Sequence, residues 1–116
     1  GKFEALSISD GSVQSEGQRL KQLLDKRRST QRFILAEEGQ TLSSPQLAQK
    51  LDQLRGQPVV FVIGGAYGLD PSIKAQADLL LSLSPMTFTH ELAQLLLSEQ
   101  VYRAISILKG GKYHHE

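Results

Sequence analysis

Residues 59–65 constrain the fold of this chain more than any other segment. Five apolar residues, most of them β-branched, stand in a row before two glycines, which is typical of a strand buried on both faces, as in a parallel sheet. The glycines leave the carboxyl end of this strand without side chains, so another molecule can approach the backbone closely. Ligands of open α/β sheets bind at that end. We therefore expect a parallel sheet with a small-molecule site beside Gly64 and Gly65.

Length and composition fit one globular domain over residues 1–116. The content of 40% hydrophobic and 22% charged residues is ordinary for a soluble protein. The sequence has no run of the roughly 18 apolar residues that a membrane span needs. It also has no apolar signal region at its start, so we expect a cytoplasmic protein without a membrane partner. Because cysteine is absent, disulfides, thiolate catalysis and cysteine-based metal sites are excluded.

The net charge of +1 hides two basic clusters. One lies between residues 21 and 32, and the other lies near the C-terminus. Their members are Lys21, Lys26, Arg27, Arg28 and Arg32, and then Arg103, Lys109 and Lys112. Such clusters either contact the phosphates of a nucleic acid or form an ordinary solvated surface, and charge alone leaves both interpretations open.

Strand-like and helix-like segments alternate along the chain. Strands are predicted at residues 3–8, 32–36, 59–65 and 79–83, and helices at residues 15–26, 44–56, 70–77 and 90–107. Residues 37–43 are predicted to form a polar loop. The order β-α-β-α-β-α-β-α predicts an α/β domain with a mostly parallel sheet and helices on both faces.

Capping signals and apolar spacing give these helices their predicted ends and faces. Ser44 followed by Pro45 predicts an N-cap and a first helical residue, and Asp70 followed by Pro71 repeats the signal. The predicted core contacts of the helices are Leu20, Leu23 and Leu24, then Leu47, Leu51 and Leu54, and finally Leu92, Leu95, Leu96 and Ile105.

Two loops at strand ends are candidates for ligand binding. Residues 64–68 fit neither the P-loop spacing nor the dinucleotide-binding fingerprint, so a tight strand-to-helix turn remains the alternative. The loop after residue 83 can offer backbone groups to a purine, with Leu83, Met86 and Phe88 as apolar walls. Its alternative is a plain connection whose apolar residues join the core. A third strand end lies at Leu35.

Histidines are the most obvious ionisable candidates. His90 stands at the start of the last helix, where a role near the N-cap is the simpler interpretation. Residues 113–116 read Tyr-His-His-Glu, but adjacent histidines point in different directions in regular structure. We therefore expect no metal site there. No nucleophile-elbow pattern is present, which argues against a serine hydrolase.

Four ordered blocks resemble the RlmH family of bacterial SPOUT-class methyltransferases. They are residues 61–69, 81–90, 101–104 and 113–116, and the similarity extends over essentially the whole chain. The resemblance implies a C-terminal trefoil knot, which general fold rules would not suggest. Family members begin with a further strand and helix, which are absent before Phe3 here. The chain is thus expected to be an N-terminally shortened SPOUT domain.

The resemblance also implies a cofactor, a substrate and a partner. The cofactor is S-adenosylmethionine, and its binding positions are Leu35, Gly65, Leu83, Ser84, Pro85, Met86, Thr87 and Phe88. The substrate is a pseudouridine of 23S ribosomal RNA in the assembled ribosome, methylated at N3. The partner is a second copy of the chain, in a homodimer that completes the active site near the subunit interface.

Methylation of a ring nitrogen requires removal of its proton by a general base, for which His90 and His114 are candidates beside His115. Arg103 is expected to stabilise negative charge on the ring or to hold a phosphate, and Tyr113 and His115 to contact the substrate. The competing interpretations are a SPOUT enzyme acting on another RNA, a nucleotide-binding regulatory module, and a non-catalytic ribosome-binding protein.

Overall fold

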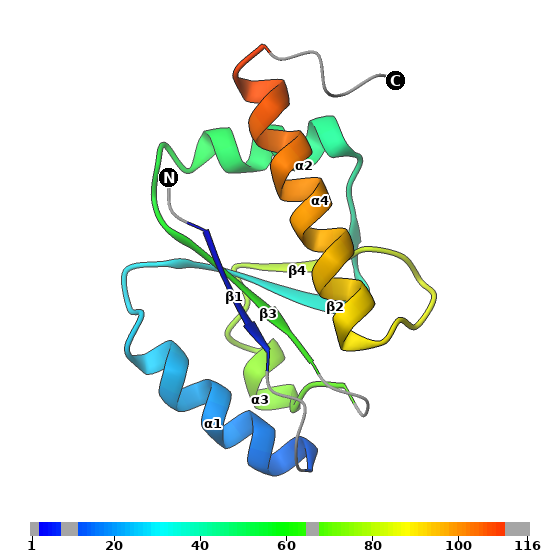
Figure 1. Cartoon of the computed structure of the whole chain (residues 1–116). Coiled ribbons are helices and arrows are strands. Elements are labelled where there is room, and N and C mark those ends of the chain that lie inside the picture. The colour runs from blue at the N-terminus through cyan, green and yellow to red at the C-terminus, as the bar shows by residue number, and fades with distance from the viewer. Residues whose placement is uncertain (1–2, 8–11, 65–67, 111–116) are drawn as a thin grey trace.

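The computed structural model describes residues 3–7, 12–64 and 68–110. In this part of the chain four strands alternate with four helices (Figure 1). The elements are β1 (Phe3–Ser7), α1 (Val13–Asp25), β2 (Gln31–Thr41), α2 (Ser44–Gln53), β3 (Val59–Ile63), α3 (Pro71–Lys74), β4 (Leu79–Ser82) and α4 (His90–Leu108). The predicted alternation is confirmed.

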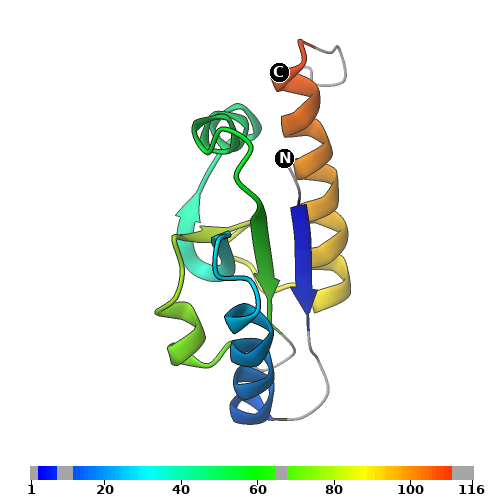
Figure 2. The same cartoon turned by 90° about the vertical axis from the view of Figure 1, so that its left-hand side faces the viewer.

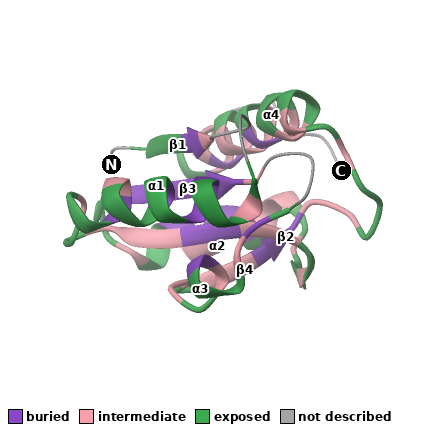
Figure 3. Cartoon of the chain, turned by 90° about the horizontal axis from the view of Figure 1, so that it is seen from below, coloured by how far each residue is buried: buried purple, intermediate pink, exposed green. Residues whose placement is uncertain are grey.

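The strands form one parallel sheet in the order β1-β3-β2-β4. β3 lies between β1 and β2, and all five of its residues are buried, as Figure 3 shows in purple. The apolar run therefore forms the doubly covered parallel strand that its sequence predicts.

Alternate residues of β3 enter two separate hydrophobic clusters. Val59, Phe61 and Ile63 pack with residues of α2 and α4, while Val60 and Val62 pack with residues of α1 and α3. Successive side chains of a strand point to opposite faces, so the helices cover both faces of the sheet, as predicted. Figure 2 shows α4 on one side of β1 and β3, with α1 and α3 on the other.

Two helix boundaries differ from their predictions. The N-cap of α2 is Ser43 rather than Ser44. Ser43 Oγ accepts a hydrogen bond from the backbone amide of Gln46, and the Gln46 side-chain oxygen accepts one from the backbone amide of Ser43. The helix that follows Asp70 covers only Pro71–Lys74, although the carboxylate of Asp70 caps it as predicted.

β2 extends through Thr41, so the predicted polar loop at residues 37–43 is wrong for most of its length. Leu81 is the partner of both Leu35 and Gln40, so residues 36–39 bulge out of the ladder between β2 and β4. A Cβ at Gly39 would lie 2.6 Å from the carbonyl oxygen of Leu80, which explains the glycine. The pairing that extends β2 is with a distant strand, so the local sequence did not reveal it.

The buried stripe of α4 is also different from the prediction. Leu97 and Ala104 are buried, whereas Leu92 and Leu95 are exposed. Leu96 and Ile105 are only partly buried. The helix is apolar around much of its circumference, so spacing alone does not identify the face that meets the sheet. None of the helices described here is long and apolar enough to cross a bilayer.

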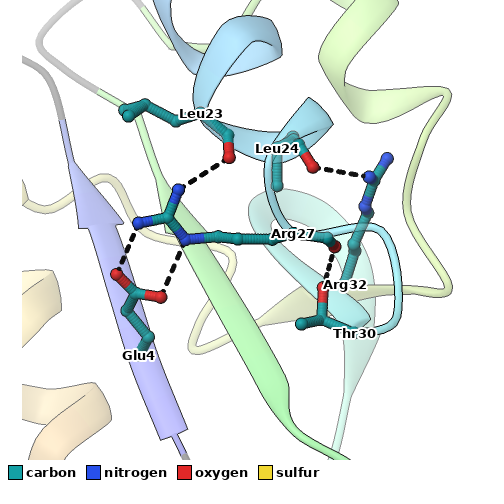
Figure 4. A network of polar contacts seen from close by, with 6 residues as sticks. All are labelled: Glu4, Leu23, Leu24, Arg27, Thr30 and Arg32. Atoms are coloured by element: carbon teal, nitrogen blue, oxygen red, sulfur yellow. Dashed lines mark hydrogen bonds and ion pairs between the residues drawn. The ribbon is translucent and has the colours of Figure 1, made fainter.

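Two arginines of the first basic cluster hold the fold together (Figure 4). Arg27 donates two hydrogen bonds of 2.8 Å to the carboxylate of Glu4 in β1 and one of 2.7 Å to the Leu23 carbonyl. Arg32 donates to the Leu24 carbonyl at 3.0 Å and also to Gln76. Both side chains therefore have internal partners, which supports a structural role rather than phosphate binding for these two.

Candidate functional site

A cavity of about 250 Å³ opens beside the bulge of β2 and the carboxyl ends of β3 and β4. Its position is the one expected for a ligand of an open parallel sheet. The lining combines apolar side chains, glycines and ionisable groups. Its described members are Leu35, Ala36, Glu37, Glu38, Ile63, Gly64, Gly68, Leu69, Lys74, Leu83, Ser84, Met86, Thr87, Phe88, His90 and Ala93.

Most of the candidate residues from the sequence lie around this one cavity. Those that line it are Leu35, Leu83, Ser84, Met86, Thr87, Phe88 and His90. Pro85 and Arg103 are not among the described lining residues. Gly65, Tyr113, His114 and His115 lie outside the residues that the structure describes. The fold thus brings the carboxyl ends of β3 and β4 together with the middle of β2. The prediction that a strand ends at Leu35 is wrong, because β2 bulges after Leu35 and then continues through Thr41.

Gly64, which follows β3, leaves room for neighbouring residues of the same chain. A Cβ at Gly64 would lie 2.8 Å from Leu69 Cγ and 3.0 Å from the carbonyl carbon of Gly68. Gly68 has a φ of +83°, a left-handed conformation that favours glycine. Gly64, Gly68 and Leu69 therefore lie close together and form one wall of the cavity. For Gly64, close packing within the protein therefore accounts for the missing side chain.

Residues 36–39 bring two carboxylates to the cavity that the sequence analysis did not single out. Glu38 Oε2 accepts a hydrogen bond of 2.7 Å from Lys74 Nζ, at the end of α3. This bond holds the pKa of Glu38 below its usual value, so the carboxylate is charged at neutral pH. In the sequence, this acidic pair directly follows the segment predicted as a strand and falls in the predicted loop, although both residues lie within β2.

The loop between β4 and α4 is fastened to the same segment of β2. Thr87 Oγ1 donates a hydrogen bond of 2.8 Å to Glu37 Oε1. Within the loop, Ser84 Oγ accepts a bond of 3.0 Å from the Met86 amide. The thioether of Met86 nevertheless remains 71% exposed. An exposed apolar side chain at the edge of a cavity is available to a ligand.

His90 is the first residue of α4, directly after the N-cap Thr89, as expected. Its Nε2 lies 3.3 Å from Glu91 Oε1. The imidazole is among the groups that line the cavity, and imidazole is a common general base in enzymes.

Arg103 belongs to a different part of α4. It forms an ion pair with Glu99 one turn earlier, with Arg103 Nε 2.9 Å from Glu99 Oε1. Thirteen residues of helix separate it from His90, which corresponds to roughly 20 Å along the axis. One chain therefore cannot bring His90 and Arg103 to the same small group.

A second cavity, of about 280 Å³, lies between α2, α4 and the end of β4. Leucines form much of its wall, and Leu83 and Phe88 separate it from the first cavity by lining both. It contains the buried hydroxyl of Ser82, which has no hydrogen-bond partner among the described residues. No charged side chain is among its described lining. The first cavity is the better candidate because it combines apolar walls with ionisable groups beside the ends of β3 and β4.

No cluster of three or more histidine or carboxylate side chains suited to a metal ion occurs in the described ranges. The expectation that the chain binds no metal stays a prediction.

Comparison with known proteins identifies relatives of the chain. A family model described as "Predicted SPOUT methyltransferase" matches residues 4–114. The chain is 46% identical over 113 residues to the "Ribosomal RNA large subunit methyltransferase H" of Synechococcus sp. (strain RCC307), covering 97% of this chain and 75% of that protein. It is 45% identical over 114 residues to the protein of the same name from Prochlorococcus marinus (strain NATL2A), covering 98% and 77%.

Proposed function

The chain belongs to the SPOUT methyltransferase family, and from this premise we propose that it methylates the RNA of the large ribosomal subunit. The proposed methyl donor is S-adenosylmethionine, and the proposed target is N3 of a pseudouridine in 23S RNA of the assembled ribosome. The observation that carries the proposal is the cavity beside the bulge of β2 and the ends of β3 and β4, in a chain 46% identical to a named ribosomal RNA methyltransferase. Since ribosomes lie in the bacterial cytoplasm, we propose that the chain acts there.

The lining of the cavity fits an adenosine-containing methyl donor. Leu35, Leu83 and Phe88 offer apolar surfaces to a purine, and the backbone of the loop after β4 offers hydrogen-bonding groups. Gly64 and Gly68 place backbone without side chains at the cavity wall. When bound, S-adenosylmethionine supplies a methyl group on a positively charged sulfur. The residues around it position the donor and exclude water.

We assign proton removal to His90. Its imidazole stands at the cavity wall, where it can accept the proton of the ring nitrogen, and Glu91 Oε1 lies 3.3 Å from its Nε2. His114 stays a second candidate for the base, with Tyr113 and His115 as proposed substrate contacts. The C-terminal trefoil knot also stays a proposal that rests on the family resemblance.

Arg103 supports the proposal of a homodimer. If His90 and Arg103 both act on one nucleotide, the roughly 20 Å of helix between them requires that they come from different subunits. The exposed side chains of Leu92, Leu95 and Tyr102 lie along one side of α4 and offer an apolar surface for such contact. We propose that two copies pair through this surface, so that Arg103 of one subunit serves the cavity of the other.

The test uses ribosomes from cells that lack the modification. They are incubated with the chain and S-adenosylmethionine carrying a labelled methyl group, and N3-methylpseudouridine is located by mass spectrometry of RNA fragments. The expected result is label at one position of 23S RNA. The matched control is Leu83→Trp, which should fill the cavity and abolish labelling.

Other outcomes would contradict the proposal in distinguishable ways. Label on transfer RNA but not on ribosomes would indicate a SPOUT enzyme with another substrate. Binding of the methyl donor without transfer to any RNA would indicate a regulatory module. Ribosome binding that needs no methyl donor and yields no label would indicate a non-catalytic protein.

A further inference from the structure

Two oppositely charged side chains stand together at the wall of the cavity. Glu38 comes from the bulge of β2, and Lys74 is the last residue of α3. Glu38 Oε2 and Lys74 Nζ are 2.7 Å apart, and the side chains are 59% and 31% exposed, respectively. The fold thus places a carboxylate and an ammonium side by side where both meet solvent and the cavity.

The ion pair is poorly explained as a stabilising contact. Exposed pairs of this kind contribute little to stability, because water screens them and two long side chains must be ordered. The two groups can also form more hydrogen bonds than the one that joins them. An ammonium has three donors and a carboxylate several acceptor positions, so each group can keep its partner and also bind a ligand.

An adjacent carboxylate and ammonium are complementary to a zwitterion. The aminoacyl end of the methyl donor carries an α-ammonium and an α-carboxylate on one carbon. Glu38 can accept hydrogen bonds from the former while Lys74 donates to the latter, and charge-assisted bonds of this type are about twice as strong as neutral ones. Thr87 already donates to the neighbouring carboxylate of Glu37, which leaves the Glu38–Lys74 pair as the zwitterion-like element of the wall.

The charges around the cavity agree with this ligand. Its described lining contains two carboxylates, Glu37 and Glu38, and one ammonium, Lys74, and these three charges sum to −1. S-adenosylmethionine carries a sulfonium and an ammonium against one carboxylate, which gives a net charge of +1. The two sums cancel, and a cavity of one sign attracts a ligand of the other.

We propose that Glu38 and Lys74 form the subsite for the zwitterionic aminoacyl end of the methyl donor. This inference rests on the proposed function, because it assumes that the cavity binds S-adenosylmethionine. It assigns to the pair the recognition of the amino acid portion, separately from recognition of the adenosine.

The test measures binding by isothermal titration calorimetry for three ligands. S-adenosylmethionine and S-adenosylhomocysteine carry the aminoacyl group, whereas 5′-methylthioadenosine has the same adenosine and sulfur without it. The variants are Lys74→Met and Glu38→Gln, and the matched control is Lys21→Met, which changes an exposed lysine of α1. Because the altered side chains are at the surface, each variant should keep the thermal unfolding midpoint of the unchanged chain to within about 3 °C.

The expected result is selective. Each subsite variant should raise Kd for the two aminoacyl ligands by about ten- to a hundredfold, the usual effect of losing a charge-assisted hydrogen bond. Kd for 5′-methylthioadenosine should change less than about twofold, and Lys21→Met should change none of the three.

Several results would overturn the inference. An unchanged Kd for S-adenosylmethionine in both variants would overturn the inference about the pair and leave the proposed function standing. An equal loss for 5′-methylthioadenosine would assign the pair to general cavity shape. Unchanged donor binding with weaker ribosome binding by Lys74→Met would assign the lysine to RNA phosphates. Failure of the unchanged chain to bind any of the three ligands would contradict the proposed function and the inference together.

Discussion

At the scale of single residues, Gly64 shows how closely the cavity wall is built. Its missing side chain leaves space that Leu69 and the backbone of Gly68 fill. We predict that Gly64→Ala lowers the free energy of unfolding by about 1–3 kcal/mol, as overpacking of a tight site does. Urea denaturation measures this loss.

The controls for Gly64→Ala are Leu69→Ala and the double variant, in which the clash between the new methyl group and the Leu69 side chain is removed. Leu69→Ala alone leaves a void and is destabilising. In the double variant the new methyl group enters that void, so the combined loss should be smaller than the sum of the single losses. Strict additivity, or no effect of Gly64→Ala, would show that Leu69 does not occupy the space beside Gly64.

Glu4 gives a prediction about pH at the same scale. Hydrogen bonds from the Arg27 guanidinium hold the pKa of Glu4 below its usual value of 4.5. A carboxylate with a depressed pKa in the folded state stabilises that state above the unfolded pKa, and the contribution is lost as pH falls through the folded pKa. The stability difference between the unchanged chain and Glu4→Gln should therefore be full above about pH 4.5 and shrink below it. A difference that is constant from pH 7 to pH 3 would contradict this assignment.

At the scale of elements, the capping box of α2 is the most direct test of a local boundary. Ser43→Ala removes the acceptor for the Gln46 amide, and we predict a loss of about 1 kcal/mol in the free energy of unfolding. Ser29→Ala, at an exposed position outside the helices, is the control. Equal stability of Ser43→Ala and the control would mean that the helix is capped elsewhere.

The elements also show what local sequence could and could not predict. The run of Val59 to Ile63 needs cover on both faces whatever its neighbours are, so its place in the sheet was predictable. The extension of β2 depends on pairing of Gln40 and Thr41 with β4, some forty residues away in sequence. The face of α4 was not predictable, because Leu95 and Leu97 are equally apolar and only the sheet determines which is buried.

Part of the candidate site was predictable from the sequence, namely the residues in or next to predicted strands. Leu35 and the loop after Leu83 were identified from strand signals and family resemblance, and the fold places them around one cavity. Glu38 and Lys74 were missed because their meeting depends on a bulge in β2 and on the end of α3. Neither the bulge nor the end of α3 has a signal in the local sequence. The charged part of the cavity wall could therefore be identified only from the structure.

At the scale of the whole molecule, the exposed apolar side of α4 is the surface through which we expect two copies to pair. Leu95 is 66% exposed on the apolar side of the helix. We predict that Leu95→Lys converts a dimer into a monomer and reduces methyl transfer, since it places a charge in the proposed interface. Size-exclusion chromatography with light scattering measures the mass.

Leu108→Lys is the matched control for Leu95→Lys. Leu108 is also exposed, but it lies at the end of α4 and on another side of it. This variant should remain dimeric. A monomeric unchanged chain, or a Leu95→Lys variant that stays dimeric, would contradict the proposed surface.

The cavity beside the bulge of β2 and the ends of β3 and β4 is proposed to bind the methyl donor. Titration of S-adenosylmethionine into the isotope-labelled chain, followed by backbone amide chemical shifts, tests it most directly. The account predicts that the largest shifts fall on Leu35, Glu38, Gly68 and the loop residues Ser84 and Thr87. Shifts confined to the second cavity, at residues 42–44 and 96–100, or no shifts at all, would contradict it.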